Sequence, residues 1–375
     1  MIADFEKIYE NRHDYMKAWK EKNPDWKVLG YICSYMPEEI LYAANVLPIR
    51  MFGAHEPQNV TEPHILGMFC PFCRDVLAQG LLGRYDYCDA IGITHTCKHV
   101  NQAYESMVTH KGFTHFFVPT PNKMQAKQAL PYYSGILGLF KKQIEEWVGR
   151  EITDDDLKRG IEIVDTNRRL MREVYETRKA EDPPISGRDS MLMVCASEMY
   201  DKVEVNKIIE DVLKNELPGR KAKDDPGIRL MILGSENDDV KFVNMVEEVG
   251  ASLVIDDHCT GSRYFWNTTE PADDLLTSIA DRYLKRPPCP IKDMPNRSRI
   301  PHLLGLAREW DVAGVIMIQQ KFCDPHELDK VALMDAFEEA GFPTLYLELD
   351  VTVPLGPFRI RVEAFLETLG SEDLF

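Results

Sequence analysis

Cysteines at the ends of apolar, β-branched runs are the feature that most constrains the fold of this chain. Five of the nine cysteines end such a run, and each is followed by a helix-like or turn-like stretch. These cysteines are Cys33, Cys97, Cys195, Cys259 and Cys323. In an open parallel sheet the ligand crevice lies outside the carboxyl ends of the strands. We therefore expect the thiols to gather there and to bind a metal or a cluster. The alternative is that some are inert, since free cysteine is among the most buried residue types.

Alternation of strand-like and helix-like segments predicts an α/β fold. The five runs that end in cysteine are expected to be strands, and further strands are expected at 47–51, 113–118, 228–233 and 344–349. We predict two doubly wound, Rossmann-like domains with parallel sheets that face a cleft, plus helical segments. The predicted divisions are an N-terminal α/β domain with cluster cysteines (1–130), a helical connector (131–185) and a C-terminal α/β domain (186–375).

Composition limits the classes of partner and the cellular compartment. The chain of 375 residues carries a net charge of −17, which argues against nucleic acid or an anionic membrane as a partner. The first residues lack the apolar core of a secretory signal, and no run approaches the length of a transmembrane helix. We therefore expect a cytoplasmic protein. An odd number of cysteines in such a protein disfavours a disulfide framework and leaves metal ligation or buried thiols.

Short motifs add to this hypothesis and exclude others. Cys70-x-x-Cys73 opens a predicted helix; it could be a redox pair or half of a zinc site, but no second pair follows. Cluster ligation is therefore favoured, with Cys73 as a ligand or only a core residue.

The chain contains no glycine-rich motif for a dinucleotide or for ATP. Arg263 and Ser262 follow Cys259 and could bind a substrate phosphate or carboxylate, although a capped turn is the alternative. No catalytic residue can be assigned.

Several segments, in this order, resemble the 2-hydroxyacyl-CoA dehydratase and class I benzoyl-CoA reductase family. They are 31–44 (YICSYMPEEILYAA), 69–75 (FCPFCRD), 94–97 (THTC), 256–264 (DDHCTGSRY) and 321–325 (KFCDP). The resemblance implies a 4Fe–4S iron–sulfur cluster held by Cys70, Cys97 and Cys323. Cys33 and Cys259 match only some branches of the family, and they either add ligands, as for a double cubane, or line the pocket. Cys88, between acidic residues, and Cys289, in a proline-rich stretch, are expected not to be ligands.

The same resemblance implies the function and the partners. The chain is expected to be the iron–sulfur subunit of a CoA-thioester reductase of the benzoyl-CoA reductase type, passing low-potential single electrons to an aromatic acyl-CoA. Implied partners are a homologous second subunit in a hetero-oligomer and an ATP-hydrolysing activator with its own iron–sulfur cluster. The alternatives are a 2-hydroxyacyl-CoA dehydratase subunit acting through a ketyl radical, a double-cubane cluster reductase, and a non-catalytic relay subunit.

Overall fold

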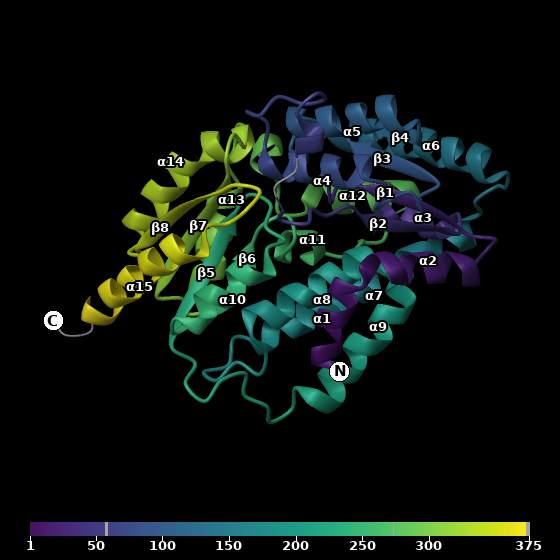
Figure 1. Cartoon of the computed structure of the whole chain (residues 1–375). Coiled ribbons are helices and arrows are strands. Elements are labelled where there is room, and N and C mark those ends of the chain that lie inside the picture. Colours follow the sequence, from purple (N-terminus) through teal and green to yellow (C-terminus); the bar gives the residue numbers. More distant parts are fainter. Residues whose placement is uncertain (57–58, 273, 373–375) are drawn as a thin grey trace.

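Two four-stranded parallel sheets with flanking helices form the framework of the chain, as a computed structural model describes it for residues 1–56, 59–272 and 274–372 (Figure 1). The first sheet has the order β2-β1-β3-β4, and the second has the order β6-β5-β7-β8. This confirms the predicted α/β fold with parallel sheets. The strands are β1 (Lys27–Tyr31), β2 (Val46–Arg50), β3 (Ala90–Thr94), β4 (Thr114–Val118), β5 (Ile228–Gly234), β6 (Ala251–Asp257), β7 (Gly314–Gln320) and β8 (Thr344–Leu349).

Helices connect the strands and cover both sheets. In the first half of the chain they are α1 (Ile2–Glu10), α2 (Arg12–Lys22), α3 (Glu38–Ala43), α4 (Pro71–Leu81), α5 (Lys98–Lys111), α6 (Ala129–Val148) and α7 (Asp154–Thr177). In the second half they are α8 (Gly187–Met199), α9 (Lys202–Asp211), α10 (Val240–Glu248), α11 (Ser262–Phe265), α12 (Leu275–Lys285), α13 (Arg299–Glu309), α14 (Asp324–Glu339) and α15 (Leu355–Glu372). Short helical turns are η1 (Asn59–Thr61), η2 (Val212–Glu216) and η3 (Pro290–Lys292).

Each sheet contains a point at which the winding direction of the chain reverses. In the first sheet β1 lies between β2 and β3, and in the second sheet β5 lies between β6 and β7. The connections that leave β1 and β3, or β5 and β7, therefore diverge to opposite faces and leave a crevice at the carboxyl ends of the strands. The predicted cysteines follow these strands: Cys33 after β1, Cys97 after β3, Cys259 after β6 and Cys323 after β7.

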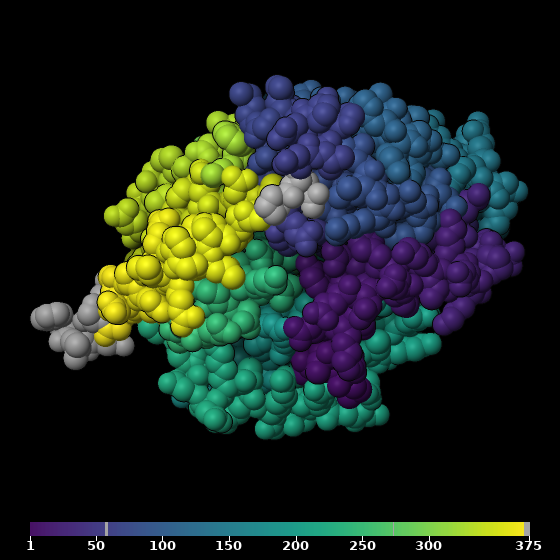
Figure 2. Space-filling view, viewed as in Figure 1, coloured from purple at the N-terminus to yellow at the C-terminus, as the bar shows by residue number. Residues whose placement is uncertain are grey.

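Helices from the two halves of the chain interlock between the sheets. Helix α8 packs against both β2 and β6, and α12 of the second half packs against α6 of the first. Helix α1 packs on α8, so the N-terminal segment (purple) lies across the teal helical region in the space-filling view (Figure 2). One apolar cluster includes residues of both sheets, such as Ile49 of β2 and Ile316 of β7. This shared core fixes the two crevices relative to each other. The division at residues 130 and 185 stays a prediction.

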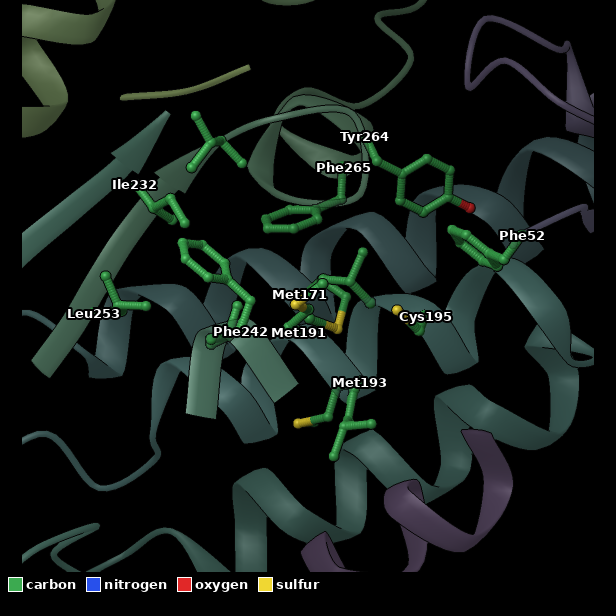
Figure 3. Packing of buried hydrophobic residues seen from close by; sticks show 14 of the residues in the cluster. Phe52, Met171, Met191, Met193, Cys195, Ile232, Phe242, Leu253, Tyr264 and Phe265 are labelled. Atoms are coloured by element: carbon green, nitrogen blue, oxygen red, sulfur yellow. The ribbon is translucent and has the colours of Figure 1, made fainter. Parts of the chain in front are cut away.

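One segment differs from the sequence-based expectation, and the predicted helical region after residue 130 consists of two helices. Residues 191–195 were expected to be a strand, but they belong to helix α8, and every residue from Ser190 to Met199 is buried. Residues 191–196 of this buried helix are all apolar, so the segment resembles a buried strand in sequence. Figure 3 shows Cys195 among apolar core side chains, with Met191 and Met193 on the same helix. The helical region at 131–179 is two helices, because Gly149 ends α6 in a left-handed conformation and Thr153 caps α7.

Candidate functional site

Seven of the nine cysteines line one pocket between the two sheets. They come from the ends of strands, the starts of helices and a connecting loop; they are Cys33, Cys70, Cys73, Cys97, Cys259, Cys289 and Cys323. No three His, Cys, Asp or Glu side chains among the described residues converge closely enough to hold a single metal ion. The thiols instead surround a shared space, and an iron–sulfur cluster, whose several irons each take their own thiolate, is the group that suits such an arrangement.

Three of the pocket thiols occupy the N-cap positions of helices. Cys70 caps α4, Cys97 caps α5 and Cys323 caps α14. The Cys97 Sγ accepts a hydrogen bond from the backbone N–H of Val100 at 3.5 Å. Unpaired N–H groups and the positive end of the helix dipole favour negative charge at this position. The three cysteines therefore lie at helix N-termini, as the sequence predicted, where the helix dipole favours a thiolate although burial opposes it.

The pKa of Cys70 is shifted in the opposite direction to that of Cys97 and Cys323. Hydrogen bonding with Cys73 lowers the pKa of Cys70 to about 6, against the effect of burial and with help from His99. The imidazole of His99 also accepts the backbone N–H of Cys70 at 3.1 Å. Burial raises the pKa of Cys97 and of Cys323 above the usual range. A bound metal centre would supply the positive charge that converts these buried thiols to thiolates.

Cys259 and Cys289 reach the pocket from the second half of the chain by different routes. Cys259 follows β6, and the Arg263 Nη1 lies 3.6 Å from its Sγ. Cys289, which the sequence excluded from the ligand set, also lines the pocket. Its backbone N–H donates to the Tyr35 hydroxyl at 3.1 Å, which ties the proline-rich loop to the segment after Cys33. Its position is a consequence of tertiary packing that no local sequence pattern indicates.

Cys88 and Cys195 lie outside this pocket. Burial raises the pKa of Cys88, as it does that of Cys97, and the neighbouring Asp89 raises it further. Its position outside the pocket is what separates Cys88 from the proposed ligands. Cys195 is fully buried within α8, and burial likewise raises its pKa. The expectation that Cys195 joins the other strand-end thiols was therefore wrong, because the segment that carries it is not a strand.

The two residues expected to contact substrate have different surroundings. Arg263 lines the pocket, but its guanidinium is held by Asp257 at 2.7 Å and by the carbonyl of Gly234 at 2.9 Å. Asp257 also pairs with Arg299 at 2.9 Å. Ser262 is fully buried, and its hydroxyl donates to the backbone carbonyl of Asp256. Arg263 therefore presents a fixed positive charge to the pocket, whereas the Ser262 hydroxyl is engaged in the turn.

Several charged pocket residues were not found from the sequence. Arg50, at the end of β2, donates to Glu198 of α8 at 3.0 Å and to the carbonyl of Cys259 at 2.9 Å. Arg286 donates to Ser34 from the far side of the pocket. Glu236 follows β5 and lines the pocket beside the thiols. Arg50 and Glu236 each lie at the end of a predicted strand, and this position was the only indication of them in the sequence. Charged residues are also common at strand ends on the protein surface, so the position does not identify a pocket residue.

Lys292 is a buried cation near the carboxyl ends of β3 and β4. Its ammonium donates to the carbonyl of His95 at 2.8 Å and to the Thr120 hydroxyl at 2.9 Å. Burial lowers its pKa to about 8, although nearby Cys33 acts in the opposite direction. The ammonium therefore keeps its charge at neutral pH, and it joins the end of β3 to the loop that carries Cys289.

Comparison with known proteins gives the family. Residues 33–369 match the family described as "2-hydroxyglutaryl-CoA dehydratase, D-component". The chain belongs to this family. It is 27% identical to the (R)-phenyllactyl-CoA dehydratase beta subunit of Clostridium sporogenes over 371 residues, which cover 98% of each chain. It is also 27% identical to a benzoyl-CoA reductase subunit of Thauera aromatica over 381 residues, again 98% of each chain.

A more distant relative broadens the range of reactions. The beta subunit of (R)-2-hydroxyglutaryl-CoA dehydratase from Acidaminococcus fermentans is 22% identical over 378 residues, which cover 98% of this chain and 99% of the relative. Dehydratases and a ring reductase are thus related to this chain along its whole length. Within the described residues, no helix is both long enough and apolar enough to cross a bilayer.

Proposed function

We propose that this chain is the iron–sulfur subunit of a CoA-thioester reductase of the benzoyl-CoA reductase type. The observation that carries the proposal is the convergence of seven cysteines on one pocket, three of them at helix N-termini. The donor set fits an iron–sulfur cluster, with Cys70, Cys97 and Cys323 as its ligands. When bound, the cluster would supply single electrons of low potential to an acyl-CoA thioester.

The chain's own residues would prepare the pocket for this chemistry. Ile32, Phe72 and Val100 provide apolar walls that limit the access of water. Arg263 faces Cys259 with a positive charge that stabilises anionic species in the pocket. Asp257 fixes the direction of that guanidinium, and Arg50 connects the loop after β6 to the end of β2. These contacts hold both walls of the pocket in place while charge enters it.

The partners follow from the subunit names of the relatives and from the chain's lack of an ATP motif. We propose a hetero-oligomer with a homologous second subunit and a separate ATP-hydrolysing activator that delivers the electrons. Copurification with a coexpressed homologous subunit is the expected result. A lone chain that is fully active with a chemical reductant would contradict it.

A 2-hydroxyacyl-CoA dehydratase is the alternative reaction, because two of the relatives are dehydratase subunits by name over nearly the full chain length. Both reactions begin with electron transfer to a thioester, so the pocket suits either. Anaerobic assays of the reconstituted complex with benzoyl-CoA and with a 2-hydroxyacyl-CoA separate them. Consumption of the aromatic thioester is expected. Dehydration of the hydroxyacyl thioester without ring reduction would replace the proposal with the alternative.

A double-cubane reductase is a second candidate because Cys33, Cys259 and Cys289 line the same pocket as the three proposed ligands. Three ligands suffice for a single cubane with one open iron, whereas the additional thiols could hold a second. Iron and sulfide per chain decide the matter: about four of each for a single cubane, about eight irons for a double cubane, and none for a scaffold.

Cysteine variants test the ligand assignment directly. Cys70→Ala, Cys97→Ala and Cys323→Ala are each expected to lose most of the iron after anaerobic purification. Cys88→Ala and Cys195→Ala are matched controls, because both thiols are buried but lie outside the pocket. Full iron retention in Cys97→Ala would overturn the assignment. Iron loss in Cys88→Ala would do the same.

A further inference from the structure

A buried carboxyl group shares the cysteine pocket. Glu236 lies in the loop after β5, is 6% exposed and lines the pocket with the seven thiols. Its Oε1 accepts a hydrogen bond from the Thr260 hydroxyl, and the Arg50 Nη2 lies 3.5 Å from the same oxygen. One oxygen of the carboxyl group is therefore anchored, and the other, Oε2, is buried without a hydrogen-bond partner among the described residues.

The charges around Glu236 do not stabilise its ionised form. Arg50 is the neighbouring cation, but it is already bonded to both oxygens of Glu198 on α8. Asp238 on the same loop adds a negative charge, and buried Cys195 on α8 faces the same group. Burial raises the pKa of Glu236 well above its usual range; Asp238 raises it further, and Arg50 and His55 oppose the shift. Burial and Asp238 thus favour the protonated form of Glu236.

Asp238, which acts electrostatically on Glu236, forms an ion pair with a partly exposed histidine. Asp238 is 1% exposed, and its Oδ1 forms an ion pair with the His55 Nε2 at 2.9 Å. His55 is partly exposed and lines a separate surface groove with Arg12 and Arg84. Although burial opposes it, Asp238 raises the pKa of His55 to about 10, so the imidazole is protonated at pH 7. The Oδ2 of Asp238, like the free oxygen of Glu236, has no hydrogen-bond partner among the described residues.

We propose that Glu236 is the catalytic acid of the cysteine pocket, and that Asp238 and His55 return protons to it from the surface groove. This rests on the proposed function. After the thioester accepts one electron from the low-potential donor, the Glu236 O–H bond breaks and its proton bonds to the substrate anion. The electron pair of the O–H bond stays on the Glu236 carboxylate beside Arg50. That carboxylate then takes a proton through Asp238 from His55, and His55 takes one from water.

The same acid serves either branch of the family reaction. In a ring reduction the proton bonds to carbon after electron transfer, and in a dehydration it bonds to the departing hydroxyl oxygen, which leaves as water. A neutral carboxylic acid is suited to both because it adds no negative charge to the pocket before the electron arrives. The assignment of Glu236 is therefore independent of which thioester is the substrate.

Infrared spectroscopy tests the acid without any substrate. The iron-loaded complex at pH 7 is expected to show a carboxylic acid carbonyl band that shifts in deuterated water and disappears in Glu236→Gln. Glu247→Gln is the matched control, since Glu247 is also 6% exposed but accepts the backbone N–H of Gly187 and does not line the pocket. The Glu236 band is expected to persist in that control. An unchanged spectrum in Glu236→Gln would overturn the proposal.

Single-turnover kinetics test the role of the acid. In Glu236→Gln, iron content and electron transfer to the thioester are expected to match the wild type, while product forms about 100-fold more slowly. In His55→Gln, the first turnover is expected to be normal because Glu236 is already protonated, whereas steady-state turnover slows. His64→Gln is the control, a partly buried histidine that packs on His110 and lines neither the pocket nor the groove. Wild-type product formation in Glu236→Gln would overturn the proposal. If the wild type itself reduces no thioester, the proposed function fails, and the infrared result still decides the acid.

Discussion

At the residue scale, Asp257 is the counter-ion of two buried arginines beside the pocket. It is fully buried and pairs with Arg263 at 2.7 Å and Arg299 at 2.9 Å. Asp257→Asn keeps the shape but leaves two buried cations without this counter-ion. Removing one partner of a buried ion pair costs about 3–5 kcal/mol, so we expect a loss of that order in urea unfolding. Asp155→Asn, which breaks an exposed pair with Lys158, is the control and is expected to change stability by less than about 0.5 kcal/mol.

The pH dependence of that loss follows from the pKa of Asp257. Burial alone would raise it, but Arg263 and Arg299 lower it well below the usual range. A carboxylate with a lowered pKa in the folded state stabilises the protein fully above the unfolded value of about 4 and less as the pH falls below it. The stability difference between wild type and Asp257→Asn is therefore expected to be constant from pH 7 to pH 5 and to shrink toward pH 3. A difference that grows in acid would contradict this assignment.

Single residues also mark the limit of what the sequence could predict about the site. Cys70, Cys97 and Cys323 were singled out by the resemblance to the family's motifs, and each also precedes a predicted helix. Cys289 reaches the pocket only because its loop bonds to Tyr35, a residue 254 positions away in sequence. The raised pKa of Glu236 comes from burial and from Asp238, while Arg50, which opposes the shift, is shared with Glu198. Such properties depend on long-range packing, which a local pattern does not record.

At the element scale, the close approach of α3 and α7 depends on one glycine. A methyl group at Gly160 of α7 would lie 2.1 Å from the backbone carbonyl oxygen of Glu39 in α3. Alanine is the better helix former by about 1 kcal/mol, but overpacking against a backbone costs about 1–3 kcal/mol. We expect Gly160→Ala to destabilise the protein in urea unfolding.

The matched control for this prediction is Gly135 in α6. It is exposed, and a methyl group there would meet no atom within 4 Å. Gly135→Ala is therefore expected to stabilise the protein by up to about 1 kcal/mol. If Gly160→Ala also stabilises the protein, α3 and α7 can move apart without loss of stability, and their close approach is not required.

The sequence predicted helices and strands correctly where only one face of the element is buried, or where the segment is rich in β-branched residues. The runs before Cys33, Cys97, Cys259 and Cys323 are β-branched and form strands. The run at Met191–Val194 failed because α8 is buried between β2 and β6 and has no polar face. The helix start was nevertheless signalled, since the Ser186 hydroxyl accepts the backbone N–H of Asp189 as an N-cap. Weighing this cap against the apolar run would have identified the helix.

At the scale of the whole molecule, the pocket draws its thiols from both sheets, and this links cluster binding to the stability of both halves. Cys70 and Cys97 belong to the first sheet's connections, and Cys259 and Cys323 belong to the second's. A ligand that binds only the assembled state stabilises every element that must be in place for binding.

Removing the cluster by anaerobic chelation is therefore expected to lower the thermal unfolding midpoint. It is also expected to increase hydrogen exchange at the starts of α4, α5 and α14 and in residues 259–265. Helices α6 and α15 do not line the pocket and serve as internal controls, with unchanged exchange. An increase confined to the first sheet would mean that the thiols of the second half do not share the cluster. That result would leave Cys323 outside the ligand set and assign the pocket's second wall to substrate alone.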